Sequence, residues 1–283
     1  MDVSIIIVNY NTKQLTSNCI KSVIEKTQGL SYEIILVDNA SNDGSKELFE
    51  DDSRITTYIY SDKNGGFGYG NNLGMKIAKG QYFLLLNSDT LLVNNAVKDF
   101  YDYAESQSQK QVYGCYLLNA EGQYGCSSFF FPAFTIKDFL KRFLNKYPKE
   151  NLNLCVKNVE AISGADMFFH REIYDTIGGF DEHIFLYGEE GEWQYRMLKA
   201  GYPCCIIPQP QIVHLEGQSM KMSPSKMAIK WKSHFYILKK HMHYPTYLIA
   251  RAYYAINLLL RNISHLMDAK YTSYFKAILS PVK

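Results

Sequence analysis

The segment YFLLLNSDT at residues 82–90 joins five consecutive hydrophobic residues to a polar ending, Asn87, Ser88 and Asp89. A short apolar run bounded by polar residues is typical of a strand buried on both faces of a sheet. Ending such a strand on a carboxylate is costly unless the carboxylate has a partner. The segment therefore predicts a central strand whose carboxyl end carries polar side chains with a functional role.

The surrounding sequence alternates between short β-rich runs and helix-like patterns. The β-rich runs lie at residues 3–8, 32–38, 55–60 and 82–87, and the helix-like patterns at residues 13–26, 44–50 and 70–79. This alternation indicates a mostly parallel sheet with right-handed crossovers and helices on both faces, an α/β fold. The later sequence predicts a helix after residue 89, a strand near 112–118, a basic helix at 136–146 and helices from residue 224 onward.

Length and composition limit the function. The 283 residues favour one large domain at 1–224 with a helical appendage at 225–283. The 30 basic and 28 acidic residues give a net charge of +2, which offers no global field for binding nucleic acid. Six cysteines without a CxxC pair favour reduced thiols and a cytoplasmic location. The start reads as a strand and not a signal peptide, and the late apolar run at 247–260 is too short and polar to span a bilayer.

Polar residues follow three of the predicted strands. They are Asn9, Tyr10 and Asn11 after the first strand, Asp38 and Asn39 after the second, and Asn87, Ser88 and Asp89 after the fourth. Each aspartate alone could be a helix N-cap or a turn residue. Because ligands of open α/β sheets bind outside the carboxyl ends of the strands, we expect the three clusters to converge on one crevice.

The glycine-rich segment DKNGGFGYGNNLG at residues 62–74 lacks the dinucleotide fingerprint. Asn71 stands where one reading frame needs its last glycine, Leu73 stands there in the other frame, and no Walker lysine follows. What remains is a loop before a helix. Its backbone N–H groups could face an anion or simply turn the chain.

Candidate groups for proton transfer and metal binding come later in the sequence. Glu189, Glu190 and Glu192 begin a predicted helix. They could form a solvated acidic first turn, or place a carboxylate inward, where desolvation raises its pKa and makes a general base. His214 ends an apolar run, and it could be satisfied by hydrogen bonds or join Asp89 in binding a divalent ion.

Taken together, the motifs resemble the family 2 inverting glycosyltransferases of the GT-A fold, and in particular the bacterial rhamnosyltransferase-like branch that builds surface polysaccharides. The matching pieces, in the family's order, are VSIIIVNYN, ILVDNASNDGS, NGGFGYGNNLG, YFLLLNSDT, GGFDEHIFLYGEEGEWQYR and VHLEGQS. Two acidic motifs depart from the usual pattern. The family's D-x-D is Asn87-Ser88-Asp89 here, and its E-D pair is Glu189-Glu190.

The resemblance implies a role for each candidate residue. Glu190 would be the catalytic base, Asp89 and His214 would hold Mn²⁺ or Mg²⁺, and Asp38 would accept a hydrogen bond from a pyrimidine base. The remaining donor-binding residues would be Asn9, Tyr10, Asn11, Asn64, Gly66, Phe67, Asn71, Asn87 and Ser88, and Asp166, Glu189 and Trp193 would contact the acceptor or support the site.

The function implied is a metal-dependent inverting transfer of a sugar such as rhamnose. The donor would be a dTDP- or UDP-sugar, and the acceptor a saccharide or a lipid-linked glycan in cell-surface polysaccharide synthesis. Two alternatives stay open: a sugar-phosphate nucleotidyltransferase, which would need a glycine-rich basic loop directly after the first strand, and a non-catalytic sugar-binding protein on a degenerate fold. The oligomeric state is also open.

The last segment, from residue 225, has its own two interpretations. Its Lys, Arg and His residues, mixed with Tyr, Trp and Leu, suit an amphipathic helix on an anionic membrane surface. Equally, it could be a helical cap packed on the catalytic domain. The first interpretation would make a cytoplasmic protein peripheral on the inner face of the membrane.

Overall fold

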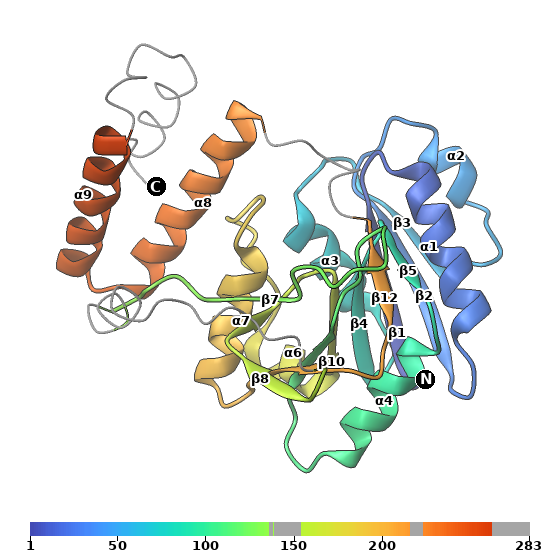
Figure 1. The fold of residues 1–283 in the computed structure, drawn as a ribbon. Helices are drawn as coiled ribbons and strands as arrows, with labels where there is room; N and C mark the ends of the chain where they lie inside the picture. The colour runs from blue at the N-terminus through green and yellow to red at the C-terminus, as the bar shows by residue number, and fades with distance from the viewer. Residues whose placement is uncertain (136–137, 139–153, 216–222, 262–283) are drawn as a thin grey trace.

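The structure, a computed structural model, describes residues 1–135, 138, 154–215 and 223–261. Its centre is an eight-stranded sheet in the order β3-β2-β1-β4-β10-β6-β11-β8 (Figure 1). The strands are β1 (Val3–Asn9), β2 (Tyr32–Asp38), β3 (Thr57–Tyr60), β4 (Tyr82–Asn87), β6 (Val112–Cys115), β8 (Lys157–Val159), β10 (Asp166–His170) and β11 (Cys204–Ile207). This arrangement confirms the predicted α/β fold, and β2 and β4 have the predicted bounds.

The strand β1 lies in the middle of the parallel part of the sheet. Ile5 pairs with Ile34 of β2 on one side and with Leu84 of β4 on the other, and all three side chains are buried. Strands buried on both faces need continuous apolar sequence, which explains the unbroken hydrophobic runs. The same register pairs Asn9 with Asp38, so the carboxyl ends of β1 and β2 meet at one edge of the sheet.

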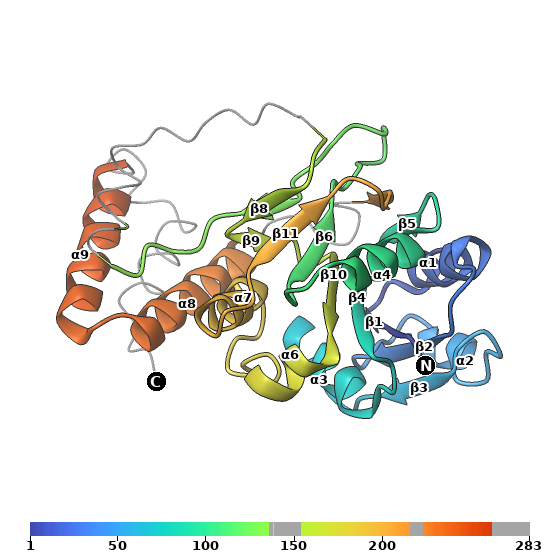
Figure 2. The ribbon, with the colours of Figure 1, turned by 90° about the horizontal axis from the view of Figure 1, so that it is seen from below.

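Helices cover both faces of the sheet (Figure 2). Helices α1 (Lys13–Lys26), α2 (Ser45–Phe49) and α4 (Ala96–Ser106) share one buried core with the sheet, and α3 (Phe67–Ile77), α6 (Arg171–Ile177) and α7 (Glu189–Lys199) share the other. Alternate residues of β1 serve the two cores: Ile7 packs into the first and Ile6 into the second. This period of two is what a strand between two helical layers requires.

The sheet is mixed because β10 enters it antiparallel, between β4 and β6. Its register pairs Asp166 with Leu86, near the end of β4. Just before β10, the carbonyl of Ala165 accepts a hydrogen bond of 3.0 Å from the N–H of Asn87. Residues from the second half of the chain therefore reach the polar end of the central strand.

Two short ribbons complete the strands: β5 (Thr90–Leu92) with β12 (Ile212–His214), and β7 (Ser128–Phe129) with β9 (Ala161–Ile162). The β5–β12 ribbon is antiparallel and pairs Thr90 with His214. The N–H of Leu215 also donates to the carbonyl of Asp89 at 2.9 Å. The ribbon thus places the imidazole of His214 beside the end of β4.

Several predicted elements have different bounds in the structure. The strand predicted at 55–60 begins at Thr57, because Ile55 is still held in a turn by its hydrogen bond to Asp52. The strand predicted at 112–118 ends at Cys115, and the helix predicted at 70–79 is Phe67–Ile77. The basic helix predicted at 136–146 lies, apart from one residue, outside the described residues.

Helices α8 (Pro224–His241) and α9 (Tyr244–Arg261) follow the sheet. Phe235, Ile237 and Leu238 of α8 are buried in a third core, which also contains Tyr247 of α9 and Ile184 of the loop before α7. The helix α8 therefore packs on the α/β domain. Within the described residues, no helix is long and apolar enough to cross a membrane.

Candidate active site

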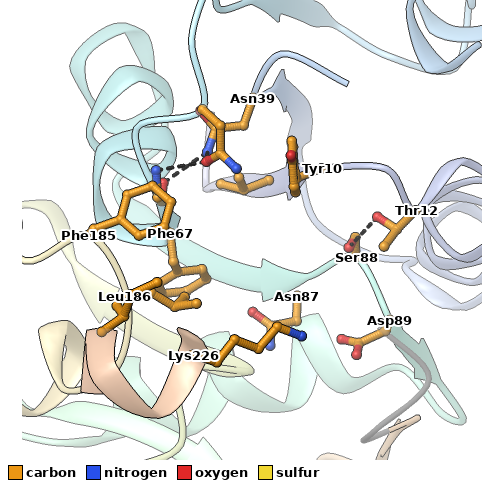
Figure 3. Close-up of a pocket in the computed structure, with 14 residues that line it drawn as sticks. Tyr10, Thr12, Asn39, Phe67, Asn87, Ser88, Asp89, Phe185, Leu186 and Lys226 are labelled. Atoms are coloured by element: carbon orange, nitrogen blue, oxygen red, sulfur yellow. Dashed lines mark hydrogen bonds between the residues drawn. The ribbon is translucent and has the colours of Figure 1, made fainter. Parts of the chain in front are cut away.

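A pocket of about 360 Å³ lies at the carboxyl ends of the central strands (Figure 3). Its lining comes from the ends of β1, β2 and β4, the loops before α3 and α7, and the first turns of α8. The lining residues are Val8, Tyr10, Thr12, Asn39, Asn64, Gly66, Phe67, Asn87, Ser88, Asp89, Phe185, Leu186, Lys226 and Ile229. Each of the three polar clusters predicted to converge contributes at least one residue to this pocket.

The first cluster is partly structural. Asn9 is buried, and its Oδ1 accepts hydrogen bonds from the hydroxyls of Thr12 (2.9 Å) and Thr16 (2.8 Å). Thr12 in turn lies 3.0 Å from the hydroxyl of Ser88. Asn9 thus holds the loop after β1 against the end of β4, while the ring of Tyr10 lines the pocket and is 39% exposed. Tyr10 is the aromatic surface of this wall on which a nucleobase could stack.

Asn11 lies outside the pocket lining. It adopts a positive φ of 54°, and its Oδ1 accepts from the N–H of Asn42 at 2.8 Å. Asparagine tolerates this left-handed conformation better than most residues, because its short side chain can hydrogen-bond locally. Asn11 therefore shapes the turn after β1.

Asp38 is fully buried beneath the pocket. One carboxylate oxygen accepts from the N–H of Ser41 at 2.8 Å, and the other accepts from the Tyr58 hydroxyl at 3.1 Å. The pocket lining contains its neighbour Asn39 instead. At this strand end the side chain that lines the pocket is therefore the amide of Asn39, and the contact of Asp38 with a pyrimidine base stays a prediction.

Asn39 fixes the glycine-rich loop. Its amide nitrogen donates to the carbonyl of Gly66 (3.0 Å) and to Oδ1 of Asn64 (3.1 Å), and its Oδ1 accepts from the N–H of Gly65 (3.2 Å). Gly66 has a φ of +91°, and a Cβ there would lie 1.8 Å from the carbonyl oxygen of Phe185. Only glycine allows this contact between two pocket-lining loops.

The other glycines of the motif serve packing. A Cβ on Gly70 would lie 2.7 Å from Val8, and one on Gly74 would lie 2.5 Å from Ile6, so α3 sits unusually close to β1. Asn71 is buried and donates to the carbonyl of Phe67 within α3. The segment therefore turns the chain and seats a helix on the sheet, and only its first part, Asn64 to Phe67, reaches the pocket.

Asp89 lines the pocket, and His214 contacts it from outside the lining residues. The Nε2 atom of His214 lies 3.3 Å from Oδ1 of Asp89 and 3.5 Å from Nδ2 of Asn87. Within the described residues, no group of three or more His, Cys, Asp or Glu side chains is placed to hold a metal ion. The pair fits a metal that takes two protein ligands, one carboxylate oxygen and one imidazole nitrogen, and the rest from phosphate and water, a donor set that suits Mn²⁺ better than Mg²⁺.

Asp166 lies behind this pair. It is fully buried, and its Oδ2 accepts a hydrogen bond of 2.6 Å from the N–H of Cys115. Burial raises the pKa of Asp166 to about 7, and the nearby His214 opposes part of that rise. Asp166 is the first residue of β10, and its supporting role stays a prediction.

Glu189 and Glu190 begin α7 on another side of the pocket. The chain enters the helix through Tyr187 and Gly188, both at positive φ (70° and 94°). Glu189 is 3% exposed, whereas Glu190 is partly buried. A Cβ on Gly164 would lie 3.5 Å both from Cβ of Glu190 and from the ring of Phe67, so Glu190 stands close to the pocket lining.

Burial raises the pKa of both carboxyls, and Glu190 has a hydrogen-bonding partner in Glu189. The rise is larger for Glu189, because the charge of Glu190 adds to its desolvation. Lys230 of α8 favours the charged form of Glu190. Both carboxyls therefore have a raised pKa, a property that suits a group that accepts a proton.

Glu192 and Trp193 belong to the structural part of α7. Glu192 pairs with Arg196 at 3.0 Å and with Lys240 and His241 of α8 at 2.8 and 3.0 Å. Trp193 is fully buried, and its indole N–H donates to the carbonyl of Gly178. The third glutamate therefore joins α7 to α8, and Trp193 is part of the buried core.

Seven lining residues had been given no role in the site from the sequence: Val8, Thr12, Asn39, Phe185, Leu186, Lys226 and Ile229. Phe185 and Leu186 belong to the apolar run before Glu189, which was the only signal pointing to them. Lys226 and Ile229 stand on α8, outside every recognisable motif, and only the packing of that helix brings them to the pocket. Figure 3 shows Lys226 near Asn87 and Leu186.

Comparison with known proteins accounts for this arrangement. The family model described as Glycosyl transferase family 2 matches residues 4–178. The chain belongs to this family. The match ends at residue 178, before Glu190, His214 and α8. The lining residues Phe185, Leu186, Lys226 and Ile229 therefore lie outside the matched region.

Two curated members of the family are similar at low identity. The dTDP-rhamnosyl transferase RfbF of Shigella flexneri is 24% identical over 258 residues, 87% of this chain and 82% of that protein. The glycosyltransferase GlyG of Streptococcus pneumoniae serotype 4 is 28% identical over 118 residues, 40% of this chain and 38% of that one. The matched part of GlyG is thus well under two thirds of its length.

Solved structures share the fold. The crystal structure of GalNAc-T7 with UDP, GalNAc and Mn²⁺ has a TM-score of 0.61 at 18% identity, and covers 84% of this chain and 48% of that one. The crystal structure of Staphylococcus aureus TarS 1-349 in complex with UDP has a TM-score of 0.56 at 16% identity, and covers 84% and 65%. At these identities the likeness concerns the fold, which is the GT-A fold expected from the sequence motifs.

Proposed function

We propose that this chain is a metal-dependent inverting glycosyltransferase that acts on a nucleoside-diphosphate sugar in cell-surface polysaccharide synthesis. The observation that carries the proposal is the contact of His214 with Asp89, which lines the same pocket as the exposed ring of Tyr10. Glu190 lies at another side of the same pocket, beside Phe67. A base-stacking surface, a cation-binding pair and a general base in one pocket are what such a transfer needs.

The donor would be bound along the carboxyl ends of the strands. The ring of Tyr10 would stack on the pyrimidine, and Asn39, Asn64 and Asn87 offer amide groups for the base, ribose and sugar. When bound between Asp89 and His214, Mn²⁺ or Mg²⁺ would stabilise the charge that develops on the departing diphosphate. Lys226 of α8 adds a fixed positive side chain to the same pocket.

Glu190 would take the proton of the acceptor hydroxyl as that hydroxyl attacks the anomeric carbon. The raised pKa of Glu190 suits this role of proton acceptor. The sugar–phosphate bond breaks as the new glycosidic bond forms, the nucleoside diphosphate leaves, and the acceptor proton ends on Glu190. One displacement of this kind inverts the anomeric centre, so the product configuration should be opposite to that of the donor.

The donor is proposed to be a dTDP- or UDP-sugar, with rhamnose as the leading sugar. The similarity to the dTDP-rhamnosyl transferase RfbF supports rhamnose, and the UDP in the TarS and GalNAc-T7 structures supports a pyrimidine nucleotide. The acceptor would be a saccharide or a lipid-linked glycan. The six free cysteines fit work in the cytoplasm, where thiols stay reduced.

Donor hydrolysis and transfer with Mn²⁺ test this proposal. Asp89→Ala should lose metal-stimulated activity, and Glu190→Gln should lose activity while it still binds nucleotide in calorimetry. Glu121→Gln, at an exposed turn, is the matched control and should behave like the wild type. NMR coupling at the anomeric carbon of the product should show inversion.

Three results would overturn it. Retention of configuration excludes the single displacement, and full activity of Glu190→Gln excludes the assigned base. Nucleotide binding without any hydrolysis or transfer would favour the alternative, a sugar-binding protein on this fold.

A further inference from the structure

The helix α9 has two different faces. Its inner face packs on α8, where Tyr247 is 2% exposed and Tyr254 makes edge contacts with the rings of Trp231 and Phe235. Ala250 and Ala255 pack against the same core. This face explains how α9 is held, and it leaves the opposite side of the helix directed away from α8.

The outer face of α9 is apolar as well. The exposed hydrophobic residues there are Tyr244 (62%), Leu248 (46%), Ile249 (63%), Tyr253 (40%) and Ile256 (55%), and Pro245 and Ala252 are also exposed. At 100° per residue, 248, 252 and 256 form one row, and 249 and 253 form the adjacent row. No charged residue interrupts these two rows. A surface helix of a globular protein normally carries polar residues on its solvent side.

The charge of this region is strongly one-sided. Helices α8 and α9 contain Lys226, Lys230, Lys232, Lys239, Lys240, Arg251 and Arg261 and no aspartate or glutamate. Because the chain has 30 basic and 28 acidic residues, these seven leave 23 basic and 28 acidic residues, a charge of −5, on the rest of the molecule. An apolar face on a cationic segment attracts an anionic surface with an apolar interior.

We propose that the outer face of α9, defined by Tyr244, Leu248, Ile249, Tyr253 and Ile256, docks on an anionic lipid bilayer. The helix lies in the interface and buries this face among the headgroups, while the lysines of α8 and the arginines of α9 add electrostatic attraction. Both views place α9 at the periphery of the molecule, beyond α8 from the sheet (Figures 1 and 2). A second copy of the chain is the competing occupant, and the positive charge of the two helices disfavours a symmetric pairing of them, even with Lys240 paired to Asp181 and Glu192.

Docking has a consequence for the acceptor, which rests on the proposed function. The helix α8 lies between α9 and the pocket, where its Lys226 and Ile229 form part of the lining. A chain seated on the bilayer through α9 therefore holds its pocket close to the membrane. That geometry selects a lipid-linked acceptor over a free saccharide.

Sedimentation of the full chain with vesicles tests the docking surface without donor or acceptor. The wild type should bind vesicles containing phosphatidylglycerol at least about tenfold more tightly than pure phosphatidylcholine vesicles, and 0.5 M salt should weaken that binding. The double variant Leu248→Asp, Ile249→Asp should reduce partitioning at least about tenfold. Its matched control, Leu48→Asp with Ile77→Asp, changes two residues that are 44% and 42% exposed on the α/β domain and should bind like the wild type.

Light scattering and donor hydrolysis in vesicle-free buffer complete the test. The α9 variant should keep the oligomeric state and hydrolysis rate of the wild type, since its two residues are outside the pocket. Equal vesicle binding by the α9 variant and its control overturns the proposal, as does binding that is indifferent to lipid charge. A dimer that the α9 substitutions dissociate identifies a second copy as the occupant and also overturns it. If the wild type binds the vesicles but does not hydrolyse the donor, the proposed function is wrong and the docking surface stands.

Discussion

Replacing Gly66 with alanine should damage the donor pocket more than the fold. Gly66 has φ 91° and ψ 178°, a region that only glycine visits freely, so any side chain costs about 1–3 kcal/mol of backbone strain. The new Cβ would also lie 1.8 Å from the carbonyl oxygen of Phe185, whereas ordinary contact begins at 3.4 Å. The loop or Phe185 must therefore move by roughly 1.6 Å, and both line the pocket. A displacement of that size should lower nucleotide affinity at least about tenfold.

Gly178 provides the matched control. Its φ of 75° and ψ of −175° place it in the same region, and a Cβ there would meet nothing within 4 Å. Gly178→Ala should therefore lower the free energy of unfolding by about 1–3 kcal/mol, as strain alone requires, and leave nucleotide binding unchanged. Urea unfolding and calorimetry with UDP or dTDP and Mn²⁺ measure the two quantities. Equal nucleotide affinities for Gly66→Ala and Gly178→Ala would refute the role of this contact in shaping the pocket.

Three further predictions concern the pocket and the helix α8. Tyr10→Ala should cost about 1–3 kcal/mol of nucleotide binding in calorimetry whereas Tyr10→Phe should not, and equal affinities would exclude stacking. Burial lowers the pKa of His234 from 6.5 to about 4, so the free energy of unfolding should be unaffected by this group above pH 6.5 and should fall as the pH drops towards 4. Urea unfolding across this range should show the fall, and His234→Phe should abolish it. Burial tends to raise the pKa of Asp181, but hydrogen bonds from Lys240 and other groups lower it overall. The ionised Asp181 therefore stabilises the fold above pH 3.8, and this contribution to the free energy of unfolding is lost as the pH falls below it. In acid denaturation, Lys240→Met should lose less stability than the wild type.

The sequence predicts the parallel half of the fold well because its signals are local. The strands 32–38 and 82–87 are continuous hydrophobic runs, and a strand buried on both faces has no other simple pattern. Their polar ends follow from topology, since parallel neighbours end at the same edge. The convergence of Tyr10, Asn39 and Asp89 on one pocket could therefore be expected from the sequence alone.

The contributions of single side chains were harder to predict. Whether Asp38 or Asn39 faces the pocket depends on a one-residue difference at the end of a strand, and successive side chains point to opposite faces. The antiparallel entry of β10 depends on pairings distant in sequence, which leave no periodic signal. Lys226 reaches the pocket only because α8 buries Phe235 and Leu238 in the third core. No motif in the sequence around Lys226 predicts that it lines the pocket.

The β5–β12 ribbon has a consequence for how the molecule is assembled during synthesis. Asn87 and His214 meet across 127 residues of sequence, so the contact of His214 with Asn87 and Asp89 cannot form until β12 has been made and has docked. Contacts of such long range form slowly, because the entropy of closing the intervening loop is lost before they contribute. A nascent chain that has emerged only as far as β11 would have Tyr10, Asn39 and Asp89 and would lack His214. The pocket is therefore completed last, when β12 and then α8 have been added.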